Sequence, residues 1–343
     1  MAAGYVIGLI FVLGFVQVNF ILSFLSHYLF LLSSLFSVMC VAGAVIRITM
    51  NAVNEQHIID MQNEQSSSSR VVGGWPAEDT QIPYQVSLRM VGPTGGVSSC
   101  GGSIIHHEWI LTAAHCLANR ITFVVRLGLT NLTRPEYIVE SANKYIHPEY
   151  DEIRAGVQTA DIALVGLDDW IPYSTTIQPC RLQNSEQKNI NYEGVRLVVS
   201  GYGRTDDLWN GGTASEILLW TFLSGVSNEY CLSWYPNSQV IKEQTVCAAY
   251  YNETSQSSCQ GDSGGPLTKV DEDGAPTMIG VVSFGSSAGC NSPWPAGYVR
   301  PGHYHDWFLE VTGINFDWNS EDLKAKPIQL DYESVDQVKI VDF

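Results

Sequence analysis

The chain has 343 residues, of which 45% are hydrophobic and 15% charged, a composition typical of a globular protein with an added apolar segment. Its 18 basic and 35 acidic residues give a formal net charge of −17 at pH 7. This charge argues against nucleic acid and anionic membranes as partners, because both would repel an acidic surface.

The chain begins with a long apolar run. No lysine, arginine, aspartate or glutamate occurs from Tyr5 to Ile46, a length sufficient for one membrane-spanning helix. A secretory signal normally has a basic start and a shorter apolar core, but Ala42-Gly43-Ala44 fits the small-residue pattern of a signal cleavage site. We therefore expect residues 1–44 to be a signal peptide that is removed. A membrane anchor and an over-extended start of the coding region are the alternatives.

Residues 45–70 are polar and end in four serines followed by Arg70. A serine-rich tract of this kind is a flexible linker, and it presents one basic residue directly before Val71-Val72-Gly73-Gly74. The pattern indicates either a site of proteolytic processing after Arg70 or a plain solvated linker.

Strand and helix patterns follow along the chain. Alternating runs such as 85–88 and 196–200 indicate β-strands. Near the end, Tyr304, Trp307, Phe308 and Val311 recur at helical spacing before Gly313, which predicts an amphipathic helix capped by a glycine.

Three short motifs carry chemical groups that can act together. His115 precedes Cys116 at the end of an apolar run, Asp161 stands at the start of another, and Ser263 lies in the glycine-rich run 258–266. A serine hydroxyl is a weak nucleophile, so it needs a general base and a group that orients the base. The glycines let a substrate carbonyl approach the amides of Gly261 and Ser263, a candidate oxyanion hole. Taken singly, each motif is also compatible with a structural role.

With these motifs in the order His, Asp, Ser, residues 71–313 resemble the chymotrypsin-fold serine proteases. The resemblance implies an all-β fold of two six-stranded antiparallel β-barrels with a C-terminal helix and an active site between the barrels. It assigns the general base to His115, the orienting carboxylate to Asp161 and the nucleophile to Ser263. It also implies that Ser283 supports the aspartate and pairs with extended substrate backbone.

The same resemblance gives a meaning to the junction at Arg70. In this family the chain is cut after the basic residue, and the new amino group, here that of Val71, pairs with the aspartate before the nucleophile, here Asp262. A buried carboxylate is costly unless it is paired, so the oxyanion hole is expected to form fully only after cleavage. Residues 45–70 would then be an activation propeptide.

Eight cysteines in a chain with a secretory-type start indicate a disulfide framework. The resemblance implies three pairs: Cys100–Cys116, Cys231–Cys247 and Cys259–Cys290. Cys40 and Cys180 are left over, and removal of residues 1–44 would leave Cys180 without a partner.

We expect no metal and no cofactor. The chain has no C-x-x-C pair, and its histidine and cysteine spacing matches no zinc pattern. Calcium-binding members of the family carry acidic ligands soon after a Leu-Gly pair, whereas Leu127-Gly128 is followed by uncharged residues.

Three positions that the resemblance assigns to the specificity pocket predict a preference for apolar substrates. Ser257 stands where trypsin-like members have an aspartate, so the floor of the pocket would carry no charge. Gly285 would leave one wall open, and Ala296 would add a methyl group to the opposite wall, favouring Leu, Met or Phe over Trp. The surrounding pattern resembles arthropod chymotrypsins and the broad-specificity brachyurin group.

Two further features complete the analysis. Asn131-Leu132-Thr133 and Asn252-Glu253-Thr254 are sequons for N-glycosylation. Residues 314–343 contain seven acidic residues against three lysines and are expected to form a mobile acidic extension, with Trp318, Ile328 and Val338 available for docking on the domain.

The sequence thus predicts a secreted, monomeric, chymotrypsin-like serine endopeptidase made as a zymogen. Its partners would be protein or peptide substrates, an activating protease and protein inhibitors. The alternative is a non-catalytic homologue that acts as a binding or cofactor protein, although such homologues normally lack a residue of the triad.

Overall fold

The computed structural model describes residues 74–154, 156–252 and 256–321. The predicted signal segment, the junction between Arg70 and Val71 and the chain beyond residue 321 lie outside these ranges. Among the helices of the described ranges, none combines the length and the apolar character needed to cross a membrane.

Most of the regular structure consists of β-strands. One sheet contains β2 (Gln85–Val91), β3 (Val97–His106), β4 (Trp109–Thr112), β5 (Thr122–Leu127), β6 (Tyr137–Ser141), β7 (Asn143–Ile146) and β8 (Ala163–Gly166). The other contains β1 (Trp75–Pro76), β9 (Arg181–Leu182), β10 (Arg196–Gly201), β11 (Leu219–Val226), β12 (Thr245–Tyr250), β13 (Pro266–Val270), β14 (Pro276–Phe284) and β15 (Ala296–Val299). Within the described ranges the helices are α2 (Ala114–Leu117), α3 (Asn228–Trp234) and α4 (His305–Thr312), with 3-10 turns η1 (Leu208–Asn210) and η2 (Pro301–His303).

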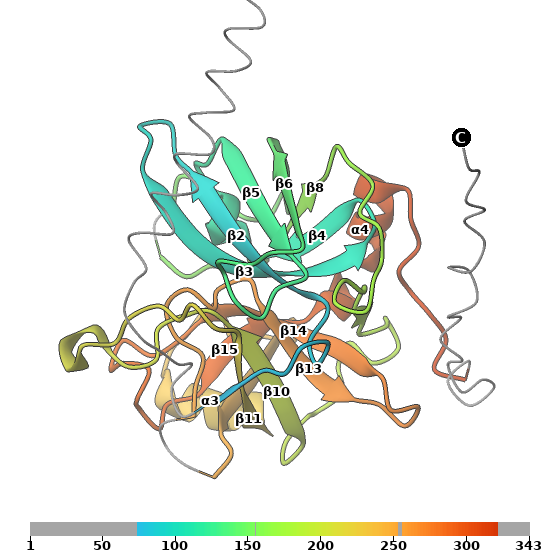
Figure 1. Cartoon of the computed structure of the whole chain (residues 1–343). Coiled ribbons are helices and arrows are strands. Elements are labelled where there is room, and N and C mark those ends of the chain that lie inside the picture. The colour runs from blue at the N-terminus through green and yellow to red at the C-terminus, as the bar shows by residue number, and fades with distance from the viewer. Residues whose placement is uncertain (1–73, 155, 253–255, 322–343) are drawn as a thin grey trace, which may run out of the picture. The chain divides into compact units, whose positions relative to one another are not determined.

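The first sheet has the strand order β6-β5-β2-β3-β4-β8-β7, with antiparallel pairing throughout (Figure 1). Its two outermost strands, β6 and β7, are consecutive in the chain and are separated only by Ala142. One stretch of chain therefore pairs with β5 on one side and with β8 on the other, so the sheet curls round on itself.

The second sheet is closed by hydrogen bonds. Its order β11-β10-β13-β14-β15-β12 returns to the start because β12 also pairs with β11, which makes a ring of six antiparallel strands. The two-residue strands are additions: β1 pairs with β11, and β9 pairs with β14 in parallel. The predicted all-β fold of two antiparallel barrels with a C-terminal helix is confirmed, with the second barrel closed and six-stranded and the first formed, among the described residues, by seven strands without pairing of β6 with β7.

The predicted strand over 85–88 is present, but its exposure differs from that of an alternating surface strand. Every residue of β2 from Gln85 to Met90 is buried, although an alternating pattern normally leaves one face in water. At the start of β2 the second face lies against the other barrel, where the Ser200 hydroxyl of β10 donates to Gln85 Oε1 at 2.7 Å, and further along Arg89 donates to the Ser99 hydroxyl of β3 at 2.5 Å. The contact between Ser200 and Gln85 joins the two barrels beneath the site described below.

Helix α4 forms at the predicted place and ends at Gly313, which adopts the left-handed conformation with φ 71°. Trp307 and Phe308 on this helix are buried and pack into the same apolar core as Ile162 and other residues of the first barrel.

The beginning of the acidic tail is docked through Trp318, one of the residues named above as available for docking, so this part is not a mobile extension. The Trp318 indole donates to the Leu182 carbonyl at 2.7 Å, and the Arg181 guanidinium lies 4.8 Å from the centre of its ring. The Asp317 carboxylate accepts from the Ser185 amide at 2.8 Å. The sequence motif Asp317-Trp318 thus ties the chain after α4 to the segment around β9.

Candidate active site

His115 and Asp161 form a hydrogen-bonded pair in the first barrel. His115 lies on the one-turn helix α2 directly after β4, and Asp161 precedes β8, the strand that pairs with β4. His115 Nδ1 lies 2.7 Å from Asp161 Oδ2, and the His115 backbone amide donates to Oδ1 at 2.8 Å. Asp161 is only 3% exposed, so its carboxylate is fixed and largely removed from water.

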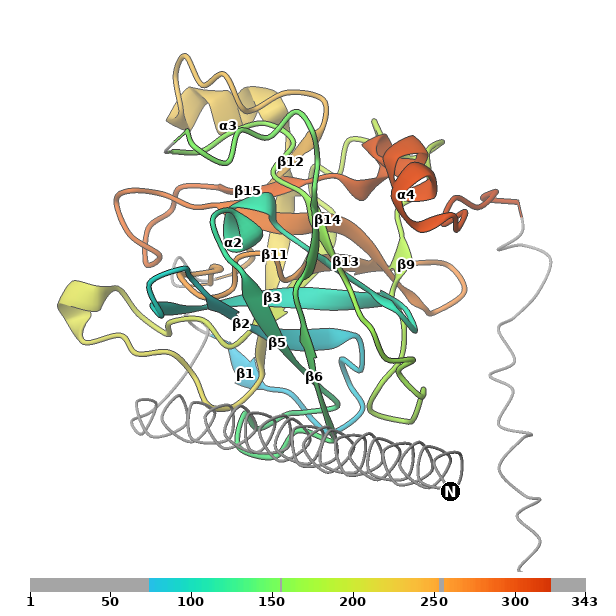
Figure 2. The ribbon, with the colours of Figure 1, turned by 90° about the horizontal axis from the view of Figure 1, so that it is seen from above.

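The second barrel supplies a third group to this pair. Ser283, in β14, donates from its hydroxyl to Asp161 Oδ2 at 2.6 Å. Figure 2 shows α2, which carries His115, close to β14 of the other barrel. The carboxylate therefore accepts hydrogen bonds from both barrels, which places the predicted residues His115, Asp161 and Ser283 in one cluster.

The electrostatics of the pair favour a proton on the imidazole. Burial lowers the pKa of His115, but the charge of Asp161 and the hydrogen bond to it outweigh this effect, and the pKa is raised above its ordinary value of 6.5. The carboxylate also fixes which ring nitrogen faces it, because Nδ1 donates to Asp161 and Nε2 is left on the opposite side of the ring.

Ser263 lies in a tight turn between the barrels. The Gly101 amide of β3 donates to the Ser263 carbonyl at 2.8 Å, and the Gly264 amide donates to the Val282 carbonyl of β14 at 2.8 Å. Gly264 has φ 77°, and a Cβ atom there would lie 2.0 Å from Thr112 Oγ1. Only glycine fits after the serine, because both the backbone conformation and the available space exclude a side chain.

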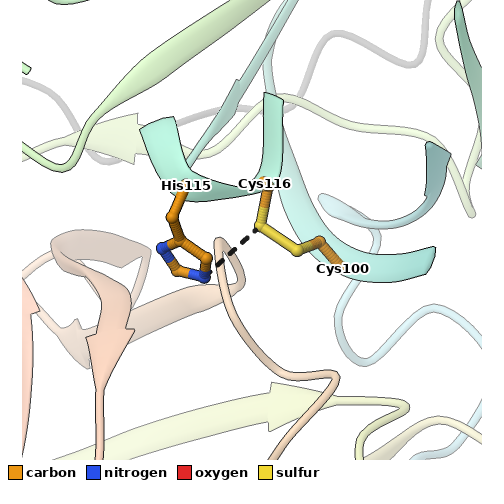
Figure 3. A group of neighbouring side chains, drawn as sticks. All are labelled: Cys100, His115 and Cys116. Atoms are coloured by element: carbon orange, nitrogen blue, oxygen red, sulfur yellow. Dashed lines mark hydrogen bonds between the residues drawn. A yellow bond between two sulfur atoms is a disulfide. The ribbon is translucent and has the colours of Figure 1, made fainter. Parts of the chain in front are cut away.

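The His115 ring and the Ser263 carbonyl group both lie close to the sulfur atom of Cys116. His115 Nε2 lies 3.8 Å from Cys116 Sγ, as the dashed line in Figure 3 shows, and the Ser263 carbonyl oxygen lies 3.6 Å from the same sulfur. The Ser263 hydroxyl and the His115 ring, both within the described ranges, are not hydrogen-bonded to each other. Cys100, His115 and Cys116 bring their potential ligand atoms within 4.8 Å of one another, but the two sulfurs form a disulfide and are not thiolates.

The segment before the serine contains the predicted oxyanion amides and a buried carboxylate. Gly261 has φ 103°, and among the described residues neither its amide nor that of Ser263 donates to a protein acceptor. The Asp262 carboxylate is fully buried and accepts from the amides of Gly203 at 2.8 Å and Cys259 at 2.9 Å. Burial raises its pKa to about 6, although these two hydrogen bonds oppose the shift. In the described ranges it forms no ion pair.

A cavity of about 110 Å³ opens beside Ser263. Its lining includes the three predicted pocket residues, Ser257, Gly285 and Ala296, together with Ser283. In the described part of the chain, no lysine, arginine, aspartate or glutamate contributes to this lining. The cavity is therefore suited to an uncharged side chain.

Several lining residues were missed by sequence reasoning. Gln260, Phe284 and Trp294 border the cavity, and Phe284 lies against Gly297, where a Cβ atom would be 2.1 Å from the ring. Phe284 and Gln260 are direct neighbours of residues assigned to the site, so proximity in sequence could have indicated them. Trp294 lies two residues before Ala296, so proximity in sequence could have indicated it as well.

The three disulfides implied by the resemblance are present: Cys100–Cys116, Cys231–Cys247 and Cys259–Cys290. Cys180 is buried and forms no disulfide with another described cysteine, and burial raises the pKa of its thiol to about 12. Of the two sequon asparagines, Asn252 is exposed and Asn131 is half-buried. Arg70, Val71 and Cys40 lie outside the described residues.

Comparisons with known proteins agree with this geometry. The trypsin family matches residues 71–308. The chain is 35% identical over 247 residues to a collagenase of Hypoderma lineatum, covering 72% of this chain and 89% of that protein. It is also 35% identical to chymotrypsin-C of Rattus norvegicus over 250 residues, covering 71% of this chain and 89% of the relative.

A solved structure is similar over the same region. The structure of HL collagenase matches with a TM-score of 0.63 at 35% identity, covering 71% of this chain and 99% of that one. A family match over most of the chain and relatives aligned over almost their whole length lead to one conclusion: this chain belongs to the trypsin family and is a serine endopeptidase.

Proposed function

We propose that this endopeptidase is secreted as a zymogen and cleaves peptide bonds after large or medium apolar residues. The observation that carries the proposal is the uncharged cavity in which Ser263 and Ser257 both take part, next to the His115–Asp161 pair. Ser263 is the nucleophile, His115 the general base and Asp161 the group that orients the base.

The chemistry follows from these positions. Ser263 Oγ attacks the substrate carbonyl while His115 Nε2 takes its proton, and the resulting imidazolium is stabilised by Asp161. The amides of Gly261 and Ser263 donate to the oxyanion, each worth about 3 kcal/mol of barrier in comparable sites. His115 then returns the proton to the leaving amine, which leaves an acyl-enzyme that water hydrolyses by the same steps in reverse order.

Asp262 supports the zymogen part of the proposal. A carboxylate with no ion pair in the described ranges and a pKa raised to about 6 by burial is costly at neutral pH. The amino group released by cleavage between Arg70 and Val71 would supply the cationic partner.

Three disulfides and the apolar start of the chain support secretion, because disulfides persist in oxidising compartments.

The experiment is cleavage profiling of the activated enzyme on a peptide library, with Ser263→Ala as the inactive control and Arg70→Gln as the uncut precursor. We expect Phe, Leu and Met to dominate before the scissile bond, and both control variants to show no cleavage. Ser257→Asp should reduce cleavage after these residues by at least about tenfold, because an unpaired carboxylate would be buried in the pocket. Dominance of Lys and Arg in the wild-type profile would refute the specificity, and full activity of Arg70→Gln without alternative cleavage would refute the zymogen.

A further inference from the structure

One wall of the pocket is held by a carboxylate from a neighbouring loop. The loop between β10 and β11 contains Asp207, which is 4% exposed. Its Oδ1 accepts from the Cys290 amide at 2.6 Å, and its Oδ2 accepts from the Asn291 amide at a longer 3.4 Å. Cys290 lines the specificity cavity, so the bond acts directly on a wall residue.

Gly289 shows how closely the two loops fit. This lining residue has φ 109°, and a Cβ atom built on it would lie 2.5 Å from Asp207 Oδ2. The carboxylate therefore occupies the space that a side chain at position 289 would need. The Asp207 carboxylate thus contacts the neighbouring loop in two ways: it accepts two backbone N–H groups, and it packs against Gly289.

Further hydrogen bonds fix the loop that carries Asp207. The Asp207 carbonyl accepts from the amides of Asn210 at 2.9 Å and Gly212 at 3.0 Å. The carboxylate of Asp206 accepts from the Asn291 side chain at 3.1 Å. At its other end the loop contacts the oxyanion segment, because the Arg204 amide donates to the Gln260 carbonyl at 2.8 Å.

We propose that Asp207 is a positioning residue that fixes the pocket wall formed by residues 285–290 and thereby sets the preference for large side chains. This wall follows the end of β14, and at Cys290 it is anchored both by the Cys259–Cys290 disulfide and by the carboxylate of Asp207. A large side chain that fills the pocket needs the wall in place, whereas a small one hardly touches it. The inference rests on the proposed specificity for apolar residues.

The test uses two variants and a matched control. Asp207→Asn keeps the shape but places an amide NH₂ against one of two N–H donors, and Asp207→Ala removes the contact. Asp168→Asn is the control, because Asp168 is exposed and, among the residues that the structure describes, its side chain bonds to Asn143 in the first barrel and not to the pocket. If Asp207→Ala fails to fold, the isosteric Asn variant still tests the inference.

Two substrates and one small reagent distinguish an effect on the specificity pocket from an effect on the reactivity of Ser263. The substrates are peptides that differ only in having Phe or Ala before the scissile bond, and the reagent is diisopropyl fluorophosphate, which labels the serine without filling the pocket. For Asp207→Asn we expect kcat/KM on the Phe peptide to fall at least about tenfold, mainly through KM, and the Ala peptide and the labelling rate to change less than about threefold. Asp168→Asn should match wild type in all three.

Two results would overturn the inference. One is an unchanged Phe-to-Ala ratio in both Asp207 variants. The other is an equal loss on both peptides and in labelling, which would show a general structural role. Failure of the proposed function is distinguishable, since the wild-type enzyme itself would then show no preference for Phe over Ala, or no labelling at all.

Discussion

At the scale of single residues, the proposed role of His115 as general base sets the pH range expected for activity. A general base at His115 needs Nε2 without a proton, while Nδ1 faces Asp161 at 2.7 Å. Because the charge and hydrogen bond of Asp161 outweigh the effect of burial, the pKa of His115 is raised above 6.5. The carboxylate that orients the base therefore also moves its titration toward neutral pH.

We predict that kcat/KM of the activated enzyme rises with pH through a midpoint above 6.5. The sign follows because a raised pKa keeps the protonated, inactive ring populated to higher pH. A pH–rate profile on a peptide substrate measures this midpoint, with substrate well below KM so that the profile reports the free enzyme. An acid limb centred at or below pH 6.5 would contradict the role of Asp161 as the stronger influence.

At the scale of the elements, the stability of helix α4 depends on the glycine that ends it. Gly313 adopts the left-handed conformation that closes the helix, and a Cβ atom on it would meet nothing within 4 Å. Substitution therefore changes only the backbone preference. Gly96, in the turn between β2 and β3, is a matched control, since a Cβ atom there also meets nothing within 4 Å but no positive φ is required.

Gly313→Ala is predicted to lower the free energy of unfolding by about 1 kcal/mol, the cost of a left-handed conformation for a residue with a Cβ atom. Gly96→Ala should stay within about 0.5 kcal/mol of the parent, as substitutions away from strained positions do. Denaturant unfolding in a Ser263→Ala background avoids self-digestion. Equal effects of the two substitutions would show that the cap does not matter.

At the scale of the whole molecule, the chain after α4 joins the segment around β9. The Trp318 side chain provides a hydrogen bond to the Leu182 carbonyl at 2.7 Å and a face for the Arg181 guanidinium. Arg181 in turn pairs with Asp271 at 2.9 Å, next to the hairpin between β13 and β14. The docked tail thus connects three segments that are far apart in sequence.

Trp318→Ala is predicted to lower the free energy of unfolding by about 2 kcal/mol, from one lost hydrogen bond, one cation–π contact and lost apolar burial. The activity of the folded enzyme should be unchanged, because Trp318 does not line the catalytic cavity. Trp209→Ala is the control, since Trp209 is 68% exposed. Thermal unfolding of both variants tests this prediction. If both unfolded at the same temperature as the parent protein, the contact of Trp318 would not stabilise the fold.

Much of this molecule was determined by local sequence. Gly261 and Gly264 in the run 258–266 supply the positive φ angles of its turn, and Gly313 supplies the left-handed conformation that ends α4. The three disulfides and the all-β fold followed from a resemblance that rests on short motifs, and the same resemblance selected the candidate site residues. Each motif is readable because it is a short continuous stretch of sequence, although the motifs themselves lie far apart in the chain.

Other features were decided only by the tertiary structure. The cover over the start of β2, the choice of Leu182 as the partner of Trp318 and the hydrogen bond from the Cys290 amide to Asp207 all join segments far apart in sequence. A half-buried strand and a strand covered by a second barrel can share one alternating pattern, and an aspartate in a loop reads as a turn residue until its acceptor role is seen. The physical reason is that the burial and the hydrogen-bond partners of a residue depend on which distant segment packs against it. A local sequence pattern carries no information about that segment.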